Sequence, residues 1–138
     1  MEKGMLTYKG AVGMGESDSN AHMNVMWYVN KYELAALSFF DAIGYDRKYA
    51  DKRNLGIVVL EQRFRYQKEV FENDALEIYS HTETLATKTT TIAHRMFNTK
   101  KELLGSAEIT YALLDKGARK AIPLPAEIKK KLEQFKMD

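Results

Sequence analysis

Residues 25–43 read VMWYVNKYELAALSFFDAI, and this stretch decides the fold. Apolar side chains occur on every turn, and the stretch is interrupted only by Asn30, Lys31, Glu33, Ser38 and Asp41. A helix with so wide an apolar surface has to be covered on most of its sides. Gly44 follows at the position where helices commonly end. We therefore expect one long, buried helix from Val25 to Ile43.

Downstream of this helix the hydrophobic period changes from helical to twofold, after a charged connection over 45–54. Residues 55–70 read as a strand that places Val58, Leu60, Phe64 and Tyr66 largely on one face and Glu61, Arg63 and Arg65 on the other. Further strands, rich in Thr, Ile and Tyr, are expected over 75–85, 89–98 and 103–115, with a weaker one over 5–14. A short helix is predicted over 126–135. One helix among a run of strands indicates an α+β fold, in which a curved antiparallel sheet wraps around the long helix.

Length and composition limit the function classes. The 138 residues suit a single domain over 1–138. Lys and Arg total 21 and Asp and Glu 19, spread along the chain, so we expect no nucleic-acid partner. Cys is absent, which removes disulfides, thiolate nucleophiles and thiolate metal sites. No apolar run approaches the roughly 20 residues that cross a membrane, and the first residues lack a signal-peptide core. These features predict a cytoplasmic protein without a membrane partner.

The residues just before the long helix carry the most chemistry. Residues 16–28 read ESDSNAHMNVMWY, with a carboxylate, an amide and an imidazole at alternate positions, Asp18, Asn20 and His22. In an extended chain, residues two apart share a direction and lie about 6.5–7 Å apart. The three side chains can therefore gather around one small ligand. The three histidines, His22, His81 and His94, have no metal-ligand spacing, so we expect no metal.

This segment resembles the signature of hotdog-fold acyl thioesterases, Asp-x-Asn-x-His followed by Asn and by a Tyr on the central helix. Asp18, Asn20, His22, Asn24 and Tyr28 match it in register. The form in betainyl-CoA thioesterases resembles residues 20–25, NAHMNV, and that in acyl-carrier-protein thioesterases resembles Asp18, Asn20 and His22. Residues 60–66, LEQRFRY, are also similar to the second strand of the betainyl-CoA group. Ala21 stands where most relatives have Gly.

The resemblance implies a hotdog fold and hydrolysis of an acyl-CoA or acyl-carrier-protein thioester. It implies Asp18 as general base or nucleophile, with Asn20 and His22 assisting. Backbone N–H groups near Asn24, at the start of the helix, are expected to polarise the thioester oxygen. Glu61 is a second candidate base, reaching the site across a dimer interface. No cofactor is expected, because CoA is part of the substrate.

Substrate-binding residues are less sharply indicated. The acyl group is expected in an apolar tunnel beside the helix, near Trp27, Tyr28 and Tyr32, which would also suit an ammonium group. The CoA phosphates are expected near Lys88, Thr90 and Arg95. An open strand edge is often covered by a second copy, so we expect a homodimer or a tetramer formed by two dimers.

Plainer explanations and rival functions stay open from the sequence. Asp18 or Asn20 can cap the helix, His22 can be structural, and Glu61 can pair with Arg63 or Arg65. The aromatic residues of the helix are core residues first. A hotdog enoyl-CoA hydratase is an alternative, but its signature has His five positions after Asp and a Pro between them, whereas here the spacing is four without Pro. A non-catalytic acyl-CoA-binding module is the other alternative.

Overall fold

A computed structural model describes residues 4–19 and 22–137 of the chain. Within this part, the chain forms strands and helices in the order β1 (Met5–Ala11), α1 (Val25–Ala42), α2 (Arg47–Arg53), β2 (Leu55–Tyr66), β3 (Ala75–Leu85), β4 (Thr89–Phe97), β5 (Leu103–Asp115), β6 (Lys120–Ile122) and α3 (Ala126–Gln134). None of the helices in the described part is both long and apolar enough to cross a membrane.

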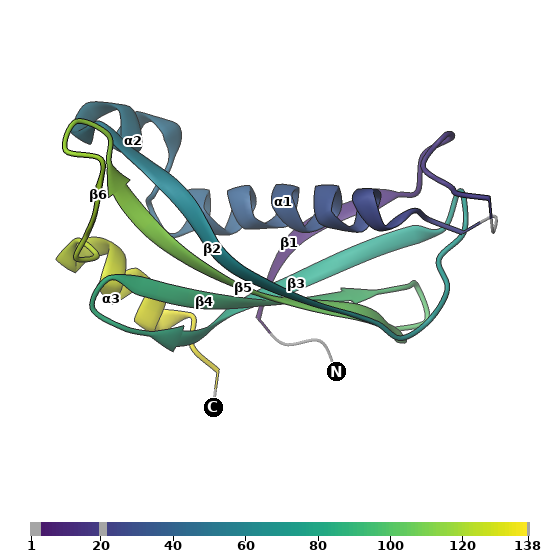
Figure 1. The fold of residues 1–138 in the computed structure, drawn as a ribbon. Helices are drawn as coiled ribbons and strands as arrows, with labels where there is room; N and C mark the ends of the chain where they lie inside the picture. Colours follow the sequence, from purple (N-terminus) through teal and green to yellow (C-terminus); the bar gives the residue numbers. More distant parts are fainter. Residues whose placement is uncertain (1–3, 20–21, 138) are drawn as a thin grey trace.

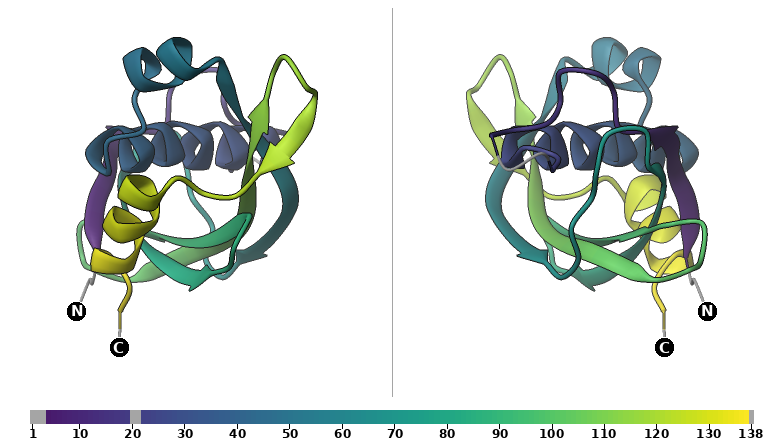
Figure 2. Two further views of the ribbon diagram at one scale, coloured as in Figure 1. Left: turned by 90° about the vertical axis from the view of Figure 1, so that its left-hand side faces the viewer. Right: turned by 90° about the vertical axis from the view of Figure 1, so that its right-hand side faces the viewer.

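The strands form one antiparallel sheet in the order β1-β3-β4-β5-β2, and the short β6 pairs with the end of β5. The sheet curls around α1, which runs along its concave side (Figures 1 and 2). This is the hotdog arrangement that the sequence predicted. β1 and β2 are the outer strands of the order, and β2 is the longer one, with 12 residues.

The core lies between α1 and the concave face of the sheet. Tyr32, Ala35 and Phe39 of α1 are almost fully buried against side chains such as Ile78, Ile92 and Met96. Residue Gly44, with φ +96°, follows the helix and lets it stop, as expected. The cover is incomplete, however, because Met26, Leu34 and Leu37 on the opposite side of α1 stay exposed.

Four strands share a buried row of polar side chains beneath α1. His94 on β4 is fully buried, with Nδ1 2.6 Å from Ser80 Oγ and Nε2 3.3 Å from Tyr111 Oη. Ser80 in turn lies 2.7 Å from Thr7 Oγ1, which donates to the carbonyl of Ile78. Every group has a partner in one arrangement of protons. The Tyr111 hydroxyl then donates to His94 Nε2, His94 Nδ1–H donates to Ser80 Oγ, and the Ser80 hydroxyl donates to Thr7 Oγ1. This row of hydrogen bonds suits the neutral form of His94, and burial lowers the pKa of His94 to about 3.

Three details differ from the sequence prediction. The connection 45–54 contains α2, whose first turn is capped by Asp46, where Oδ1 accepts from the Tyr49 N–H at 2.8 Å. β2 ends at Tyr66 rather than at residue 70. A register shift between Val59 and Glu61 changes which side chains face inward. As a result Ile57, not Val58, packs against the core, whereas Phe64 and Tyr66 face inward as predicted.

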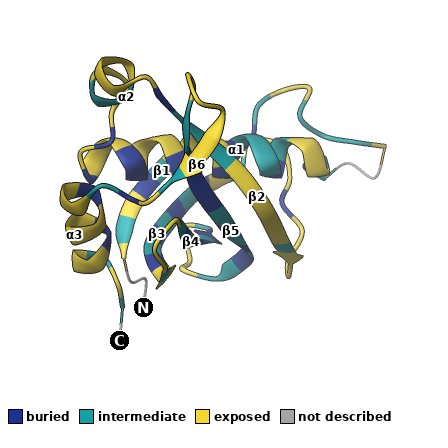
Figure 3. Cartoon of the chain, turned by 60° about the vertical axis from the view of Figure 1, so that its left-hand side comes forward, coloured by how far each residue is buried: buried dark blue, intermediate teal, exposed yellow. Residues whose placement is uncertain are grey.

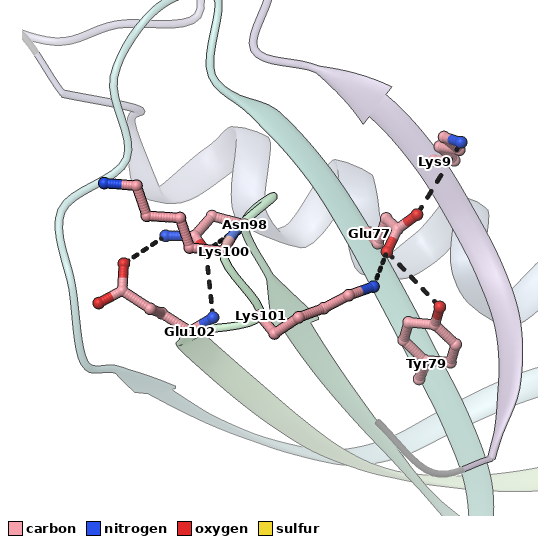
Figure 4. A network of polar contacts seen from close by, with 7 residues as sticks. All are labelled: Lys9, Glu77, Tyr79, Asn98, Lys100, Lys101 and Glu102. Atoms are coloured by element: carbon pink, nitrogen blue, oxygen red, sulfur yellow. Dashed lines mark hydrogen bonds and ion pairs between the residues drawn. The ribbon is translucent and has the colours of Figure 1, made fainter. Parts of the chain in front are cut away.

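Polar contacts tie β1, β3 and the β4–β5 turn together (Figure 4). Glu77 on β3 accepts from Lys101 at 3.4 Å and lies 4.0 Å from Lys9. Within the turn, Asn98 Oδ1 accepts from the N–H groups of Lys100 and Glu102. These contacts link the outer strand β1 to β3 and to the β4–β5 turn.

Candidate active site

The segment between β1 and α1 forms a narrow loop that is held by backbone hydrogen bonds. The Asn24 N–H donates to the Glu16 carbonyl at 2.8 Å, and the Asp18 N–H donates to the His22 carbonyl at 2.9 Å. The N–H of Met23 donates to the Val70 carbonyl at 2.6 Å, which joins the loop to the segment after β2. Asp18 is thereby fixed near the start of α1. Asn20 lies outside the described residues.

Asn24 caps α1 with its side chain, because Oδ1 accepts from the Met26 N–H at 3.0 Å. The Asn24 N–H is already bonded to Glu16. The first N–H groups of a helix have no acceptor inside the helix, and Val25 is the first residue of α1. Among the described residues, the amides of Asn24, Met26 and Trp27 have acceptors, so the Val25 N–H is the one there that is left for a ligand.

A cavity of about 230 Å³ opens beside this helix start. Its walls are mostly apolar, and it is lined by Asp18, His22, Met23, Val25, Tyr28, Tyr66, Gln67, Lys68 and Glu69. The carboxylate of Asp18 and the ring of His22 are partly exposed at its wall, with Oδ1 and Nε2 3.9 Å apart. This distance is too long for a direct hydrogen bond, so the two groups can hold a small polar group between them.

Tyr28 forms the inner wall of the cavity. It is 4 % exposed, and its ring stands edge-on to Tyr66 with centroids 4.9 Å apart. Burial, followed by the nearby Tyr66 and Glu69, raises the pKa of Tyr28 to about 12. Tyr28 therefore stays a neutral phenol that can donate a hydrogen bond.

The other two aromatic residues that the sequence predicted at the site, Trp27 and Tyr32, lie outside the lining. Trp27 packs beside Lys31, whose Nζ is 5.7 Å from its ring centroid. Tyr32 is 1 % exposed, and its hydroxyl has no hydrogen-bond partner among the described residues. Burial raises the pKa of the Tyr32 phenol well above its usual range. An aromatic enclosure made of Trp27, Tyr28 and Tyr32 is not assembled here.

The residues expected to bind the CoA phosphates are not brought together near Asp18. Thr90 is 2 % exposed, and its hydroxyl donates to the Thr84 carbonyl. Arg95 is outside the concave face, with Nη2 4.0 Å from Met137 Sδ. Lys88 lies in the β3–β4 turn, at the end of the sheet near α3 and opposite the start of α1 (Figure 1).

Glu61 lies on the convex face of the sheet. It borders a polar groove of about 180 Å³ together with Arg63, Glu83, Thr91, Glu108 and Thr110. Its strand register pairs it with Thr110, away from α1. Within one chain it is therefore separated from Asp18 by the sheet.

A second carboxylate that the sequence did not single out is Glu69. It follows β2 and lines the same cavity as Asp18. The Met23–Val70 hydrogen bond brings this segment to the loop. The described residues contain no cluster of three or more His, Cys, Asp or Glu side chains able to hold a metal ion.

The family model of the thioesterase-like superfamily matches residues 12–132, which include the loop, the cavity and nearly the whole fold. The chain belongs to this superfamily. No curated protein sequence matches it at a significant level.

Solved structures agree with the hotdog fold of this thioesterase-like chain. The hypothetical protein SAV2348 from Staphylococcus aureus, in complex with CoA, has a TM-score of 0.89 at 15 % identity, covering 98 % of this chain and 86 % of that one. The probable thioesterase YbaW from Escherichia coli has a TM-score of 0.80 at 23 % identity, covering 95 % and 98 %. The DHNA-CoA thioesterase from S. aureus has a TM-score of 0.79 at 18 % identity, covering 87 % and 80 %. At these identities, the likeness concerns the fold.

Proposed function

We propose that this thioesterase-like chain hydrolyses an acyl-CoA thioester, with Asp18 as general base or nucleophile. The observation that carries the proposal is one cavity lined by both Asp18 and Val25, the first residue of α1. It combines a carboxylate with an amide N–H at a helix N-terminus, where the macrodipole favours negative charge. Superfamily membership supports thioester hydrolysis as the general reaction.

The side chains and the amide at this cavity can carry out thioester hydrolysis in successive steps. With Asp18 as base, its carboxylate takes a proton from water while the water oxygen attacks the carbonyl carbon. The Val25 N–H bonds to the oxygen that gains the negative charge. When the C–S bond breaks, the thiolate of CoA leaves, helped by its thiol pKa of about 8.5. His22 and Tyr28 stand at the same wall and are placed to hold the water or the carbonyl.

The cavity favours a small acyl group. An engineered apolar cavity of about 150 Å³ is enough for benzene. The 230 Å³ beside Tyr28 and Tyr66 therefore suits a short, branched or single-ring acyl group better than a long chain. CoA is favoured as the carrier because the relatives named above include one that binds CoA and one named for a CoA ester. A carrier-protein thioester is the second candidate.

A homodimer joined along β2 is part of the proposal, and two such dimers can form a tetramer. β2 is a 12-residue outer strand whose Val59 and Leu60 are 41 % and 57 % exposed. Much of the strand is exposed in Figure 3. Long apolar edge strands are usually covered because their free N–H and C=O groups pair readily. A twofold axis would pair the two β2 strands antiparallel and close the sheet edge.

The test is thiol release from acetyl-, isobutyryl-, benzoyl- and palmitoyl-CoA, followed with a chromogenic thiol reagent. We expect kcat/KM for isobutyryl- or benzoyl-CoA to exceed that for palmitoyl-CoA about tenfold or more, because one or a few carbons already change pocket binding by 1–3 kcal/mol. A preference for palmitoyl-CoA would contradict the small cavity. Hydration of crotonyl-CoA without thiol release would favour the hydratase, and binding without either reaction would favour the binding module.

A further inference from the structure

Glu69 adds a second negative charge to the cavity that contains Asp18. Both carboxylates line this cavity, whose walls are otherwise mostly apolar. The Glu69 side chain forms no ion pair with any described residue. A carboxylate without a cationic partner acts on every charged group that enters the cavity.

The backbone fixes the position of Glu69. The Lys68 N–H donates to the Leu104 carbonyl at 3.1 Å, and the Val70 carbonyl accepts from the Met23 N–H at 2.6 Å. Val70 is also completely buried. Glu69 therefore lies between two anchored residues, and its own side chain is at the exposed rim of the cavity.

The charge of Glu69 is felt at the inner wall of the cavity. After burial and the nearby Tyr66, Glu69 is the third cause of the raised pKa of Tyr28. The Tyr28 and Tyr66 rings stand edge-on to each other and form this wall. If the Val25 N–H binds the thioester oxygen, the wall of Tyr28 and Tyr66 is the apolar surface left for the acyl group. The acyl group then lies in the field of the Glu69 carboxylate.

The cation next to Glu69 in the chain is already neutralised. Lys68 lines the same cavity, but its Nζ lies 2.6 Å from Glu102 Oε2. Glu102 is itself held in place, because its Oε1 accepts from Asn98 Nδ2 at 2.9 Å (Figure 4). Lys68 is therefore directed to Glu102 and does not offset the charge of Glu69.

The wider surroundings of Glu69 are also net negative. On its other side, Glu69 borders a polar groove of about 240 Å³ that lies along the β4–β5 turn. Besides the His22 ring, the described residues that line the cavity and this groove supply four carboxylates against two ammonium groups: Asp18, Glu69, Asp74 and Glu102 against Lys68 and Lys100. A negatively charged group that enters the cavity therefore meets repulsion without a free counter-charge beside it.

We propose that Glu69 sets the charge selectivity of the acyl site: it rejects acyl groups that end in a carboxylate and admits neutral or ammonium-bearing groups of the same size. This inference rests on the proposed acyl-CoA hydrolysis and specifies the class of acyl group. A second carboxylate beside Glu69 loses hydration at the apolar wall and is repelled by the charge already there. A methyl group at the same place loses nothing of this kind.

Three acyl-CoA substrates of matched length measure this selectivity. Butyryl-, β-alanyl- and succinyl-CoA carry a methyl, an ammonium and a carboxylate group at the same position of the acyl chain. For the wild type, we expect kcat/KM for both butyryl- and β-alanyl-CoA to exceed that for succinyl-CoA. In Glu69→Gln, the ratio of kcat/KM for butyryl-CoA to that for succinyl-CoA should fall about tenfold, because one like charge is removed near the protein surface. The ratio cancels any effect of the substitution that is common to both substrates.

A charge reversal and a matched control complete this test. Glu69→Lys should lower the butyryl-to-succinyl ratio further and make succinyl-CoA a better substrate than β-alanyl-CoA. The control Glu72→Gln removes the same charge from an exposed residue that does not line the cavity, and it should keep the wild-type ratio. An unchanged ratio in both Glu69 variants would overturn the proposal. An equal fall in Glu72→Gln would also overturn it, because net charge alone would then explain the effect.

Binding of thioether analogues separates this inference from the proposed reaction. S-Butyl-CoA and S-(3-carboxypropyl)-CoA differ in their terminal charge and cannot be hydrolysed as thioesters. By calorimetry, we expect the wild type to bind the butyl analogue about tenfold more tightly, and Glu69→Gln to bind the two with a smaller difference. This result without thiol release from any acyl-CoA would refute the reaction and leave the role of Glu69. Equal affinity of the wild type for both analogues, with thiol release from butyryl-CoA, would overturn the role of Glu69 and leave the reaction.

Discussion

Glu69 and Glu61 are the two candidates for a second catalytic carboxylate beside Asp18. Glu69 lines the cavity and lies close enough to Tyr28 to raise the pKa of that phenol, whereas Glu61 borders the convex groove. We expect Glu69→Gln to lower kcat/KM about tenfold, because the cavity loses a charge that orients polar groups. Glu61→Gln should stay within about twofold of the wild type. Steady-state thiol release for both variants decides between them, and the reverse order would support Glu61 acting across an interface.

The loop that carries Asp18 is anchored by a buried ion pair. Lys31 on α1 is 4 % exposed, and its Nζ lies 2.9 Å from Glu16 Oε1 and within 6 Å of the rings of Tyr8 and Trp27. The Glu16 carboxylate also accepts from the Gly13 N–H at 2.8 Å. Although burial opposes it, these two partners lower the pKa of Glu16. The pair links the base of the loop to the second turn of the helix.

Breaking this pair is expected to loosen the loop. Lys31→Met leaves Glu16 without its cation and should reduce the free energy of unfolding by about 3 kcal/mol. Hydrogen exchange of the Asp18 and Asn24 amides should rise more than that of amides in β4 and β5. Lys9→Met, which removes an exposed contact of 4.0 Å, should leave both quantities near wild type. Uniform acceleration of exchange would mean that the pair supports the whole fold and not the loop in particular.

At the residue scale, the sequence predicted local features better than distant ones. Asp18, His22 and the amides at the helix start are neighbours in the chain, so their order alone placed them near one another. Glu69 was missed because the Met23–Val70 hydrogen bond joins segments about fifty residues apart. The partners of Lys31 likewise come from β1 and the loop, and no short pattern records such contacts.

At the scale of strands, His94 should make stability depend on pH. Its pKa is about 3 in the folded protein and 6.5 as the ordinary value, so above pH 6.5 both states are neutral and the full stability is present. As pH falls below 6.5, the unfolded chain takes up a proton that the folded chain refuses until about pH 3. Stability should therefore fall by about 1.4 kcal/mol per pH unit over this window.

Denaturant unfolding of the wild type and His94→Gln between pH 7 and 4 measures this effect. The variant is expected to be less stable at pH 7, because the row from Tyr111 to Thr7 loses a matched partner. Its loss of stability toward pH 4 should be shallower than that of the wild type. Parallel pH profiles would show that His94 is not the group responsible.

The long helix and the main strands followed from periodicity, but α2, the short β6 and the bulge in β2 did not. α2 is short and mostly charged, and its stability comes from the Asp46 cap, the left-handed Asn54 and the hydrogen bond from Tyr49 Oη to Glu127 at 2.6 Å. The first two signals are local and could have been found. The bulge in β2 follows from pairing with β5, so the alternation alone placed Val58 on the wrong face.

At the scale of the whole molecule, the exposed edge of β2 predicts the oligomer. Leu60→Asp places a charge on the strand edge and should convert dimers into monomers, as measured by analytical ultracentrifugation. Leu6→Asp makes the same change on β1, where Leu6 is 46 % exposed, and should leave the dimer intact. A monomeric wild type, or dissociation by Leu6→Asp alone, would contradict pairing along β2.

The sequence indicated a covered edge but not which edge, because strand order is a property of the whole fold. The same limit applies to the residues expected to bind the CoA phosphates. Lys88, Thr90 and Arg95 are close in sequence, but the Thr90 hydroxyl donates to the Thr84 carbonyl, whereas the Arg95 guanidinium contacts Met137 Sδ. The end of α2 and the β5–β6 turn lie more than sixty residues apart in sequence, and only the fold brings them together.

The most direct test of the central claim is thiol release by the wild type and by Asp18→Asn on the best acyl-CoA, with substrate binding measured on both. We predict that the substitution lowers kcat about a thousandfold while the dissociation constant stays within a few-fold. If Asp18→Asn keeps wild-type turnover, Asp18 is not the base or nucleophile and the proposed mechanism is wrong.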